Sequence, residues 1–316
     1  MKKDLKVSKT ANSKFKINEK KLVKLTDMGN VKEIMYLQKK CNQPFGIKKI
    51  SKDEYMVIAT GEIKEYSNRS ENRSEDKESL RKTFKHIREL INTNFTGEPN
   101  ELIFTITYKE NVRDTKRLYD DFRKFMKKLK YRYNQVEYIN VVEPQGRGAW
   151  HCHILLKFPD VRKIYIPNKE IAEMWGQGFV KVKALKKGID NIGAYLSAYL
   201  GDVEINNDNI TELVNDGVLE PGQAFETKTA EINGVKKTFI KGGRLHYYPS
   251  GMNIYRTSRG IKKPQVTYMM YENARKKVGS NLEPTYTSHT FIQDDTGTIV
   301  NEIAYEQYNI KKAQNQ

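Results

Sequence analysis

Residues 150–158, with the sequence WHCHILLKF, alternate between two kinds of side chain. Every second position is apolar, from Trp150 to Phe158. Successive side chains of a strand point to opposite faces of a sheet, so one face of this segment belongs to a hydrophobic core. His151 and His153 then share the other face, roughly 6.5–7 Å apart along the strand. The pattern predicts a two-faced strand that presents a pair of histidines.

The segments around this strand alternate between strand-like and helix-like patterns. Strand patterns occupy 54–66, 101–110, 134–143, 149–158 and 179–185. Apolar residues recur at helical spacing in 74–95, 113–133, 167–178 and 187–202. The linker PQGRG joins two of the strands and predicts a β-hairpin. We therefore expect an α+β fold, in which a central, mainly antiparallel five-stranded sheet is covered by helices.

Composition divides the chain into four expected segments. Residues 1–50 contain fourteen lysines and four acidic residues, which predicts a basic, partly disordered N-terminal arm. Residues 51–202 form the main globular domain. An acidic and then glycine-rich stretch, 203–243, is typical of a variable insertion. Residues 244–316 form a C-terminal region that begins with many basic and aromatic side chains.

Charge and cysteine content narrow the range of partners. Lys and Arg number 56 against 39 Asp and Glu, a formal net charge of +17, which favours a polyanionic partner. Cys41 and Cys152 belong to no CxxC pair, so we expect neither a disulfide framework nor a zinc knuckle. The sequence contains neither a run of eighteen apolar residues nor a signal-peptide pattern. We expect a cytoplasmic protein with no membrane segment.

Two histidines on one strand face suit a divalent metal ion, with a carboxylate from the neighbouring strand as third ligand. Glu143 ends the preceding strand and is the expected third ligand for Mg²⁺ or Mn²⁺. A plain loop over 144–149 would pair Glu143 with Trp150 and turn the carboxylate to the core. We expect a bulge, or a loop that includes Trp150, to bring Glu143 opposite His151. The alternative is that the histidines only pack at the sheet surface.

Tyr195 and Tyr199 are four residues apart in an expected helix, so they share one helix face. Tyrosine pairs at this spacing commonly serve packing. Beside a metal strand in a basic chain they have a second interpretation, because a tyrosine hydroxyl can attack a phosphodiester.

Three segments together resemble the motifs of HUH endonucleases, in the branch of rolling-circle replication initiators (Rep). LIFTITY at 102–108 resembles the Thr-rich first motif, HCHILL at 151–156 the His-hydrophobic-His motif, and AYLSAYLGD at 194–202 the two-tyrosine third motif. Ala198 stands where many members carry lysine. The segments EPQGRGAWHCH and RLHYYPSGMNIYRTSRGIKKP are also similar to stretches in Rep proteins of bacterial phages and plasmids.

The resemblance implies a ferredoxin- or RRM-like nuclease core and a metal held by Glu143, His151 and His153. It also implies that Tyr195, or Tyr199 beside it, nicks one strand of origin DNA, leaving a 5′-phosphotyrosine and a free 3′-OH. The origin is expected to be single-stranded or locally melted, in a bacterial host. Because the sequence lacks a P-loop, a host helicase is expected as partner. The alternatives are a relaxase or transposase of the same superfamily, and a non-catalytic nucleic-acid-binding protein.

Further residues are candidates for DNA contact. They are Arg147 in the hairpin loop, Thr105 and Thr107 on the first-motif strand, and Arg117, Arg123, Lys124, Lys127 and Lys128 on the basic helix face. A solvated helix face and ordinary β-propensity explain the same residues equally well.

Overall fold

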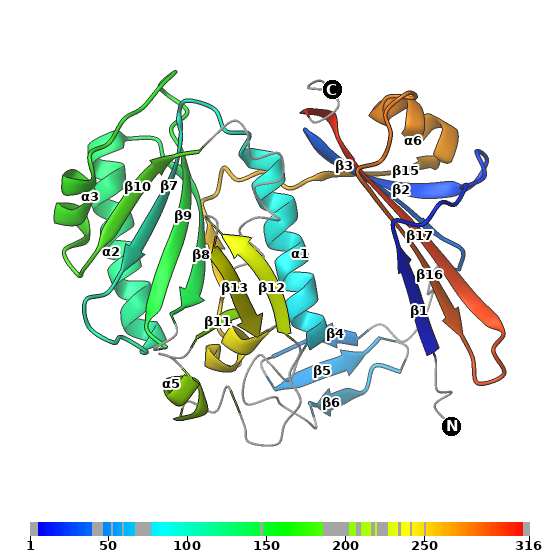
Figure 1. Ribbon diagram of the computed structural model, residues 1–316, viewed down its shortest axis with the longest axis horizontal. Coiled ribbons are helices and arrows are strands. Elements are labelled where there is room, and N and C mark those ends of the chain that lie inside the picture. Colours follow the sequence, from blue (N-terminus) through cyan, green and yellow to red (C-terminus); the bar gives the residue numbers. More distant parts are fainter. Residues whose placement is uncertain are drawn as a thin grey trace. The chain divides into compact units, whose positions relative to one another are not determined.

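Figure 1 presents the chain as a computed structural model. The structure describes residues 6–39, 47–51, 53–58, 60–66, 77–145, 148–185, 202–206, 210–215, 219, 227–232, 235–240, 242–249 and 251–311. Two compact units divide the chain, one made of Met1–Arg69 with Pro264–Gln316 and the other of Ser70–Lys263. These limits differ from the four segments expected from composition. We refer to them as the terminal unit and the central unit.

A five-stranded antiparallel sheet forms the centre of the central unit, so the α+β class and the antiparallel sheet are confirmed. Its strand order is β10-β7-β9-β8-β14. The strands span Glu101–Thr107 (β7), Glu137–Pro144 (β8), Trp150–Lys157 (β9), Val180–Ala184 (β10) and Tyr255–Thr257 (β14).

Helices cover both faces of this sheet (Figure 1). They are α1 (Lys77–Asn94), α2 (Thr115–Tyr133) and α3 (Asn168–Trp175). On the side of Trp150, α2 packs Phe122 against Tyr138, with ring centroids 5.6 Å apart. On the side of the histidines, α1 places His86 beside Tyr255. The second face of the sheet is therefore covered along part of its length, and Leu155 there is fully buried.

One expected strand belongs elsewhere. Residues 54–66 form two short strands, β5 (Glu54–Val57) and β6 (Ile63–Glu65), in a separate sheet with β4 (Ile47–Lys49). The fifth strand of the central sheet is instead β14, which pairs with β8. Ser258, just after β14, accepts a hydrogen bond from the Tyr138 backbone N–H at 2.8 Å and donates one to Glu137. Contacts distant in sequence thus complete the sheet.

The terminal unit contains a six-stranded sheet of order β1-β16-β17-β3-β2-β15. Its strands are β1 (Lys6–Ala11), β2 (Leu22–Met28), β3 (Val31–Leu37), β15 (Gln265–Met270), β16 (Tyr286–Gln293) and β17 (Ile299–Asn309). Helix α6 (Tyr271–Val278) contributes Ala274 and Val278 to a core with Val23, Leu25 and Ile34. Much of the expected basic arm is therefore folded, since β2 and β3 alternate buried apolar with polar residues.

The segment after the central domain has its own small sheet, of order β11-β13-β12. It comprises β11 (Val203–Ile205), β12 (Thr227–Ile232) and β13 (Val235–Ile240), with helix α5 (Ile210–Asn215) nearby in sequence. The 3₁₀ helix η2 (Gly243–Tyr247) follows and leads the chain back to the central sheet. Among the described residues, no helix is long and apolar enough to span a membrane.

Candidate metal centre

The β8–β9 pairing decides where Glu143 points. Glu143 lies opposite His151, and Val141 lies opposite His153. The expected register is confirmed, but neither expected cause is present: Pro144 extends β8 and pairs with Trp150, so the connecting loop shortens to 145–149. That five-residue connection is closed by a hydrogen bond from Gln145 N–H to the Ala149 carbonyl, 2.7 Å long. The shorter loop restores the parity that puts the carboxylate on the histidine face.

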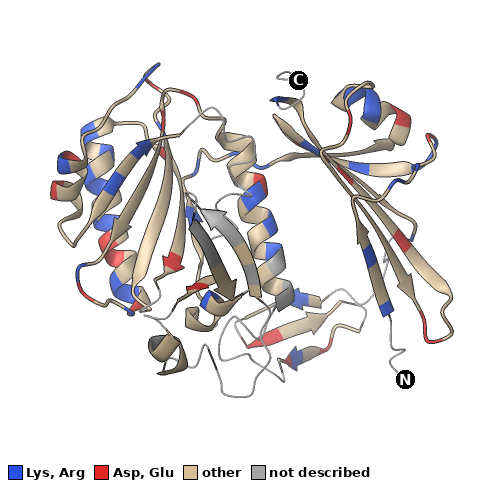
Figure 2. Cartoon of the chain, viewed as in Figure 1, with Lys and Arg blue, Asp and Glu red and all other residues tan. Residues whose placement is uncertain are grey.

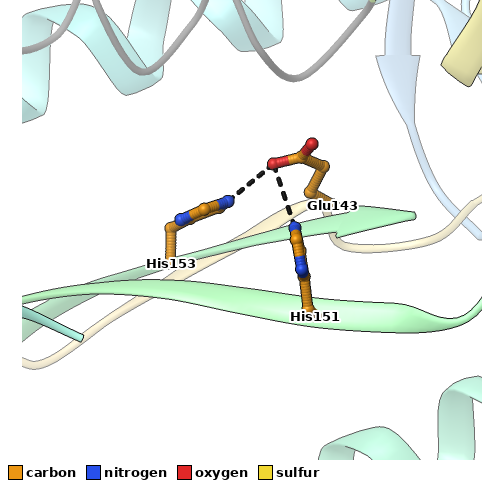
Figure 3. A group of neighbouring side chains, drawn as sticks. All are labelled: Glu143, His151 and His153. Carbon is orange, nitrogen blue, oxygen red and sulfur yellow. Dashed lines mark hydrogen bonds and ion pairs between the residues drawn. The ribbon is translucent and has the colours of Figure 1, made fainter. Parts of the chain in front are cut away.

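Glu143, His151 and His153 converge in space, as Figure 3 shows. Glu143 Oε2 lies 2.6 Å from His153 Nε2 and 3.3 Å from His151 Nε2. One ligand atom from each residue lies within 4.8 Å of the other two. These three residues, which we call the metal triad, could hold a metal ion.

Burial keeps the two imidazoles neutral. Desolvation lowers the pKa of His151 to about 3, with a further contribution from the neighbouring His153. Desolvation alone lowers the pKa of His153 to about 4. A neutral imidazole is the form that binds a metal ion, so both side chains are in the ligand state at neutral pH.

The histidine nitrogens are arranged as metal ligands require. Thr105 Oγ1 lies 3.3 Å from His153 Nδ1, and Gln145 Nε2 lies 3.5 Å from His151 Nδ1. The Nδ1 atoms thus have neighbours that fix the rings, and the Nε2 atoms face the carboxylate. His151 Nε2 is buried without a hydrogen-bond partner among the described residues. A buried polar atom in that state fits an absent cation ligated by neutral nitrogens and one carboxylate.

Arg244 joins the triad from η2. Its guanidinium contacts Oε1 of Glu143, and Nη1 donates to the Pro144 carbonyl at 3.3 Å. The side chain is mostly buried, which lowers the pKa of Arg244, and its Nε has no hydrogen-bond partner among the described residues. Sequence reasoning noted the segment that starts with Arg244 only as a basic and aromatic stretch. No periodicity links it to Glu143, so the contact is visible only in the fold.

Cys152 lies between the two histidines in sequence but belongs to the other face. It is buried at 1% exposure, and burial raises the pKa of its thiol to about 12. A thiol in that state does not ionise at neutral pH, so Cys152 is a core residue and not a ligand.

Thr105 and Thr107 lie on the histidine face, opposite His153 and His151 respectively. Thr105 supports His153, as described above. Thr107 donates its hydroxyl hydrogen to the Phe179 carbonyl at 3.2 Å. Both hydroxyls therefore have partners within the sheet. The other predicted residues near the site, Arg147, Tyr195 and Tyr199, lie outside the described residues.

The basic residues of α2 are brought together on the helix surface but not at the triad, and Figure 2 shows them along this helix. Arg117 pairs with Glu110 at 2.9 Å, Arg123 with Asp120 at 2.9 Å, and Lys124 with Asp121 at 3.7 Å. Lys128 donates to the Met174 carbonyl, and Lys127 lines a groove described below. Helix α2 packs on the Trp150 face, so these side chains lie across the sheet from the histidines.

Comparison with known proteins gives one family match. Residues 101–204 match a family model of replication-associated proteins of the ORF2 type. No curated protein matches the chain. The matched segment runs from β7 through β11 and contains the whole metal triad. The chain is therefore similar, over the segment that carries this site, to replication-associated proteins, and the match supports a replication initiator.

Proposed function

We propose that this protein starts rolling-circle DNA replication by nicking one strand of an origin. The observation that carries the proposal is the convergence of Glu143, His151 and His153 within the segment similar to replication-associated proteins. Neutral buried imidazoles beside a carboxylate suit a divalent ion such as Mg²⁺ or Mn²⁺. The proposed product is a DNA end linked to tyrosine.

The proposed reaction is a transesterification. The phenolic oxygen of Tyr195 forms a bond to phosphorus, the bond from phosphorus to the 3′ oxygen breaks, and the phenol proton is lost as the 3′ oxygen gains one. A phenol has a pKa of about 10, so the attack needs assistance at neutral pH. A divalent ion bound by the triad would supply it by polarising a non-bridging phosphate oxygen. Glu143, His151 and His153 hold that ion, and Thr105 fixes the ring of His153.

Two tyrosines suit the end of a replication round. Tyr195 is proposed to hold the 5′ end of the first cut, while Tyr199 attacks the regenerated origin. The phosphotyrosine retains the energy of the broken ester, so a 3′-OH can reseal the strand without a nucleotide cofactor. The substrate is then single-stranded or locally melted origin DNA in a bacterial cytoplasm, and a host helicase unwinds the duplex.

The phosphate contacts of this substrate are proposed to include Arg147 and basic residues of α2. Thr105 and Thr107 have partners within the sheet, so their proposed role is to support the site more than to contact DNA.

Capture of the covalent adduct tests the proposal. The full chain is incubated with a library of randomised single-stranded oligonucleotides in Mn²⁺, and adducts that survive denaturation are isolated, digested and sequenced. We expect one sequence to be enriched, no adduct in EDTA, and a nucleotide attached to the peptide that contains Tyr195 and Tyr199. Cleavage without an adduct, or an adduct on another residue, contradicts the proposed mechanism. Retention of DNA without cleavage under all conditions indicates the non-catalytic alternative.

A further inference from the structure

A groove of about 800 Å³ lies between α2 and the edge of the sheet formed by β8 and β14. Residues that line it include Lys116, Tyr119, Lys130, Tyr138 and Arg256. We call it the α2 groove.

The α2 groove and the metal triad lie on opposite faces of the sheet. Arg256 pairs with Asn140, which in turn pairs with Ile154. Ile154 belongs to the apolar face of β9, whereas His151 pairs with Glu143 on the other face. Because side chains alternate along each strand, the two sites are separated by the thickness of the sheet.

The lining of the groove is strongly cationic. Five basic residues and a single carboxylate, Asp120, contribute to it. Asp120 is 2.9 Å from Arg123 and is thereby paired. The other basic residues form no ion pair with a carboxylate in the described part of the chain, and they are Lys116, Lys127, Lys130 and Arg256.

Aromatic rings hold some of these cations in place. The Arg256 guanidinium lies over the Tyr119 ring, 3.6 Å from its centroid. The Tyr119 hydroxyl accepts a hydrogen bond from the Asn253 N–H at 3.2 Å, which fixes the ring. Lys130 Nζ lies 5.7 Å from the centroid of Tyr138. Since cations occupy these ring faces, the groove is suited to phosphates more than to stacked bases.

The spacing of the cations along α2 indicates the length of the ligand. Lys116, Arg123, Lys127 and Lys130 are separated by seven, four and three residues, so they form one stripe on the helix. At 1.5 Å per residue the stripe is about 21 Å long. A small anion covers only part of that length, whereas about six nucleotides of a DNA strand cover all of it.

We propose that the α2 groove binds the sugar–phosphate backbone of DNA on the face of the sheet opposite the metal triad. This inference rests on the proposed function, because it assigns to the groove the DNA that flanks the nicked strand. Binding there depends on charge and not on sequence, and it weakens steeply with salt. The triad face then cuts the strand while the opposite face retains the molecule.

The test compares two double charge reversals on the same helix. Lys116→Glu with Lys130→Glu alters the groove, and Lys124→Glu with Lys128→Glu is the matched control outside its lining. All four lysines are exposed, so the fold is expected to survive, which circular dichroism checks. Binding of the full chain to fluorescent 30-nucleotide and 30-base-pair DNA is measured in EDTA, where nicking does not contribute.

We expect the groove variant to lose at least tenfold in affinity, and its salt slope to fall by about 2, while the control changes less than about twofold. Loss with the duplex, the single strand or both supports the proposal and identifies the form held there. Equal losses in both variants, or no loss in the groove variant, overturn it. Because the assay needs no metal or nicking, failure of the proposed chemistry leaves its outcome unchanged.

Discussion

The Arg244 guanidinium contacts Oε1 of Glu143, while Oε2 of the same carboxylate faces Nε2 of both His151 and His153. The two oxygens thus have different neighbours. A cation bound between Oε2 and the histidines leaves the contact of Arg244 with Oε1 in place. Arg244 comes from outside residues 101–204, so a segment beyond the family match contributes to the site.

Replacement of Arg244 by alanine is expected to weaken Mn²⁺ binding about 10–100-fold, the usual effect of losing an outer partner of a metal ligand. Without the guanidinium, Glu143 is left buried with Oε1 unpaired, and the carboxylate is free to turn away from the histidines. Isothermal titration of the protein without DNA measures the change. Added guanidinium ions are expected to restore part of the affinity, and equimolar sodium is not.

Arg256→Ala is the matched control, because Arg256 is a partly buried arginine on the opposite face of the same sheet. It is expected to leave Mn²⁺ affinity unchanged. If Arg244→Ala binds Mn²⁺ as tightly as the parent or more tightly, the guanidinium only competes with the ion and does not position Glu143.

His153→Ala is expected to reduce Mn²⁺ affinity by more than about 100-fold, since a direct ligand matters at least as much as its outer partners. His289→Ala serves as control. His289 Nε2 lies 2.6 Å from Glu302, but that pair belongs to no three-ligand cluster among the described residues. Electron paramagnetic resonance of free Mn²⁺ reports both affinities. Similar losses in the two variants, or none in either, contradict the assignment of the triad.

Glu101→Ala is expected to lower the free energy of unfolding by about 3–5 kcal/mol, the cost of removing one partner of a buried charge pair. Glu101 is fully buried, accepts hydrogen bonds from the N–H groups of Thr96, Gly97 and Glu98, and pairs with Lys157 at 3.0 Å. Urea unfolding measures the change. Glu98→Ala, at an exposed neighbouring position, is expected to cost less than about 1 kcal/mol. Equal costs at the two positions would show that burial of Glu101 has no special effect.

The sequence was sufficient for the local parts of the site. Strict alternation in β9 predicted that His151 and His153 share a face, because a strand has a side-chain period of two. It also predicted that Glu143 lies opposite His151, since only that register keeps the carboxylate off the core face. The number of residues in the β8–β9 loop was not predictable in the same way, because Pro144 fits both a strand end and a turn.

Relationships between distant segments could not be predicted. The contact of Arg244 with Glu143 and the pairing of β14 with β8 both depend on how the chain returns after residue 202. The lysines of the first fifty residues concealed β2 and β3, where buried Val23 and Leu25 alternate with polar neighbours. In each case the tertiary fold, and not local propensity, determined the outcome.

Replacement of both Tyr195 and Tyr199 by phenylalanine tests the central claim most directly. The parent and the double variant are compared on the single-stranded sequence found by adduct capture, in Mn²⁺, with Tyr131→Phe as a control at a highly exposed tyrosine. We predict that the double variant neither cleaves this strand nor forms an adduct, while it still binds the DNA and Mn²⁺. Cleavage by the double variant at the rate of the parent would contradict tyrosine attack at this metal triad.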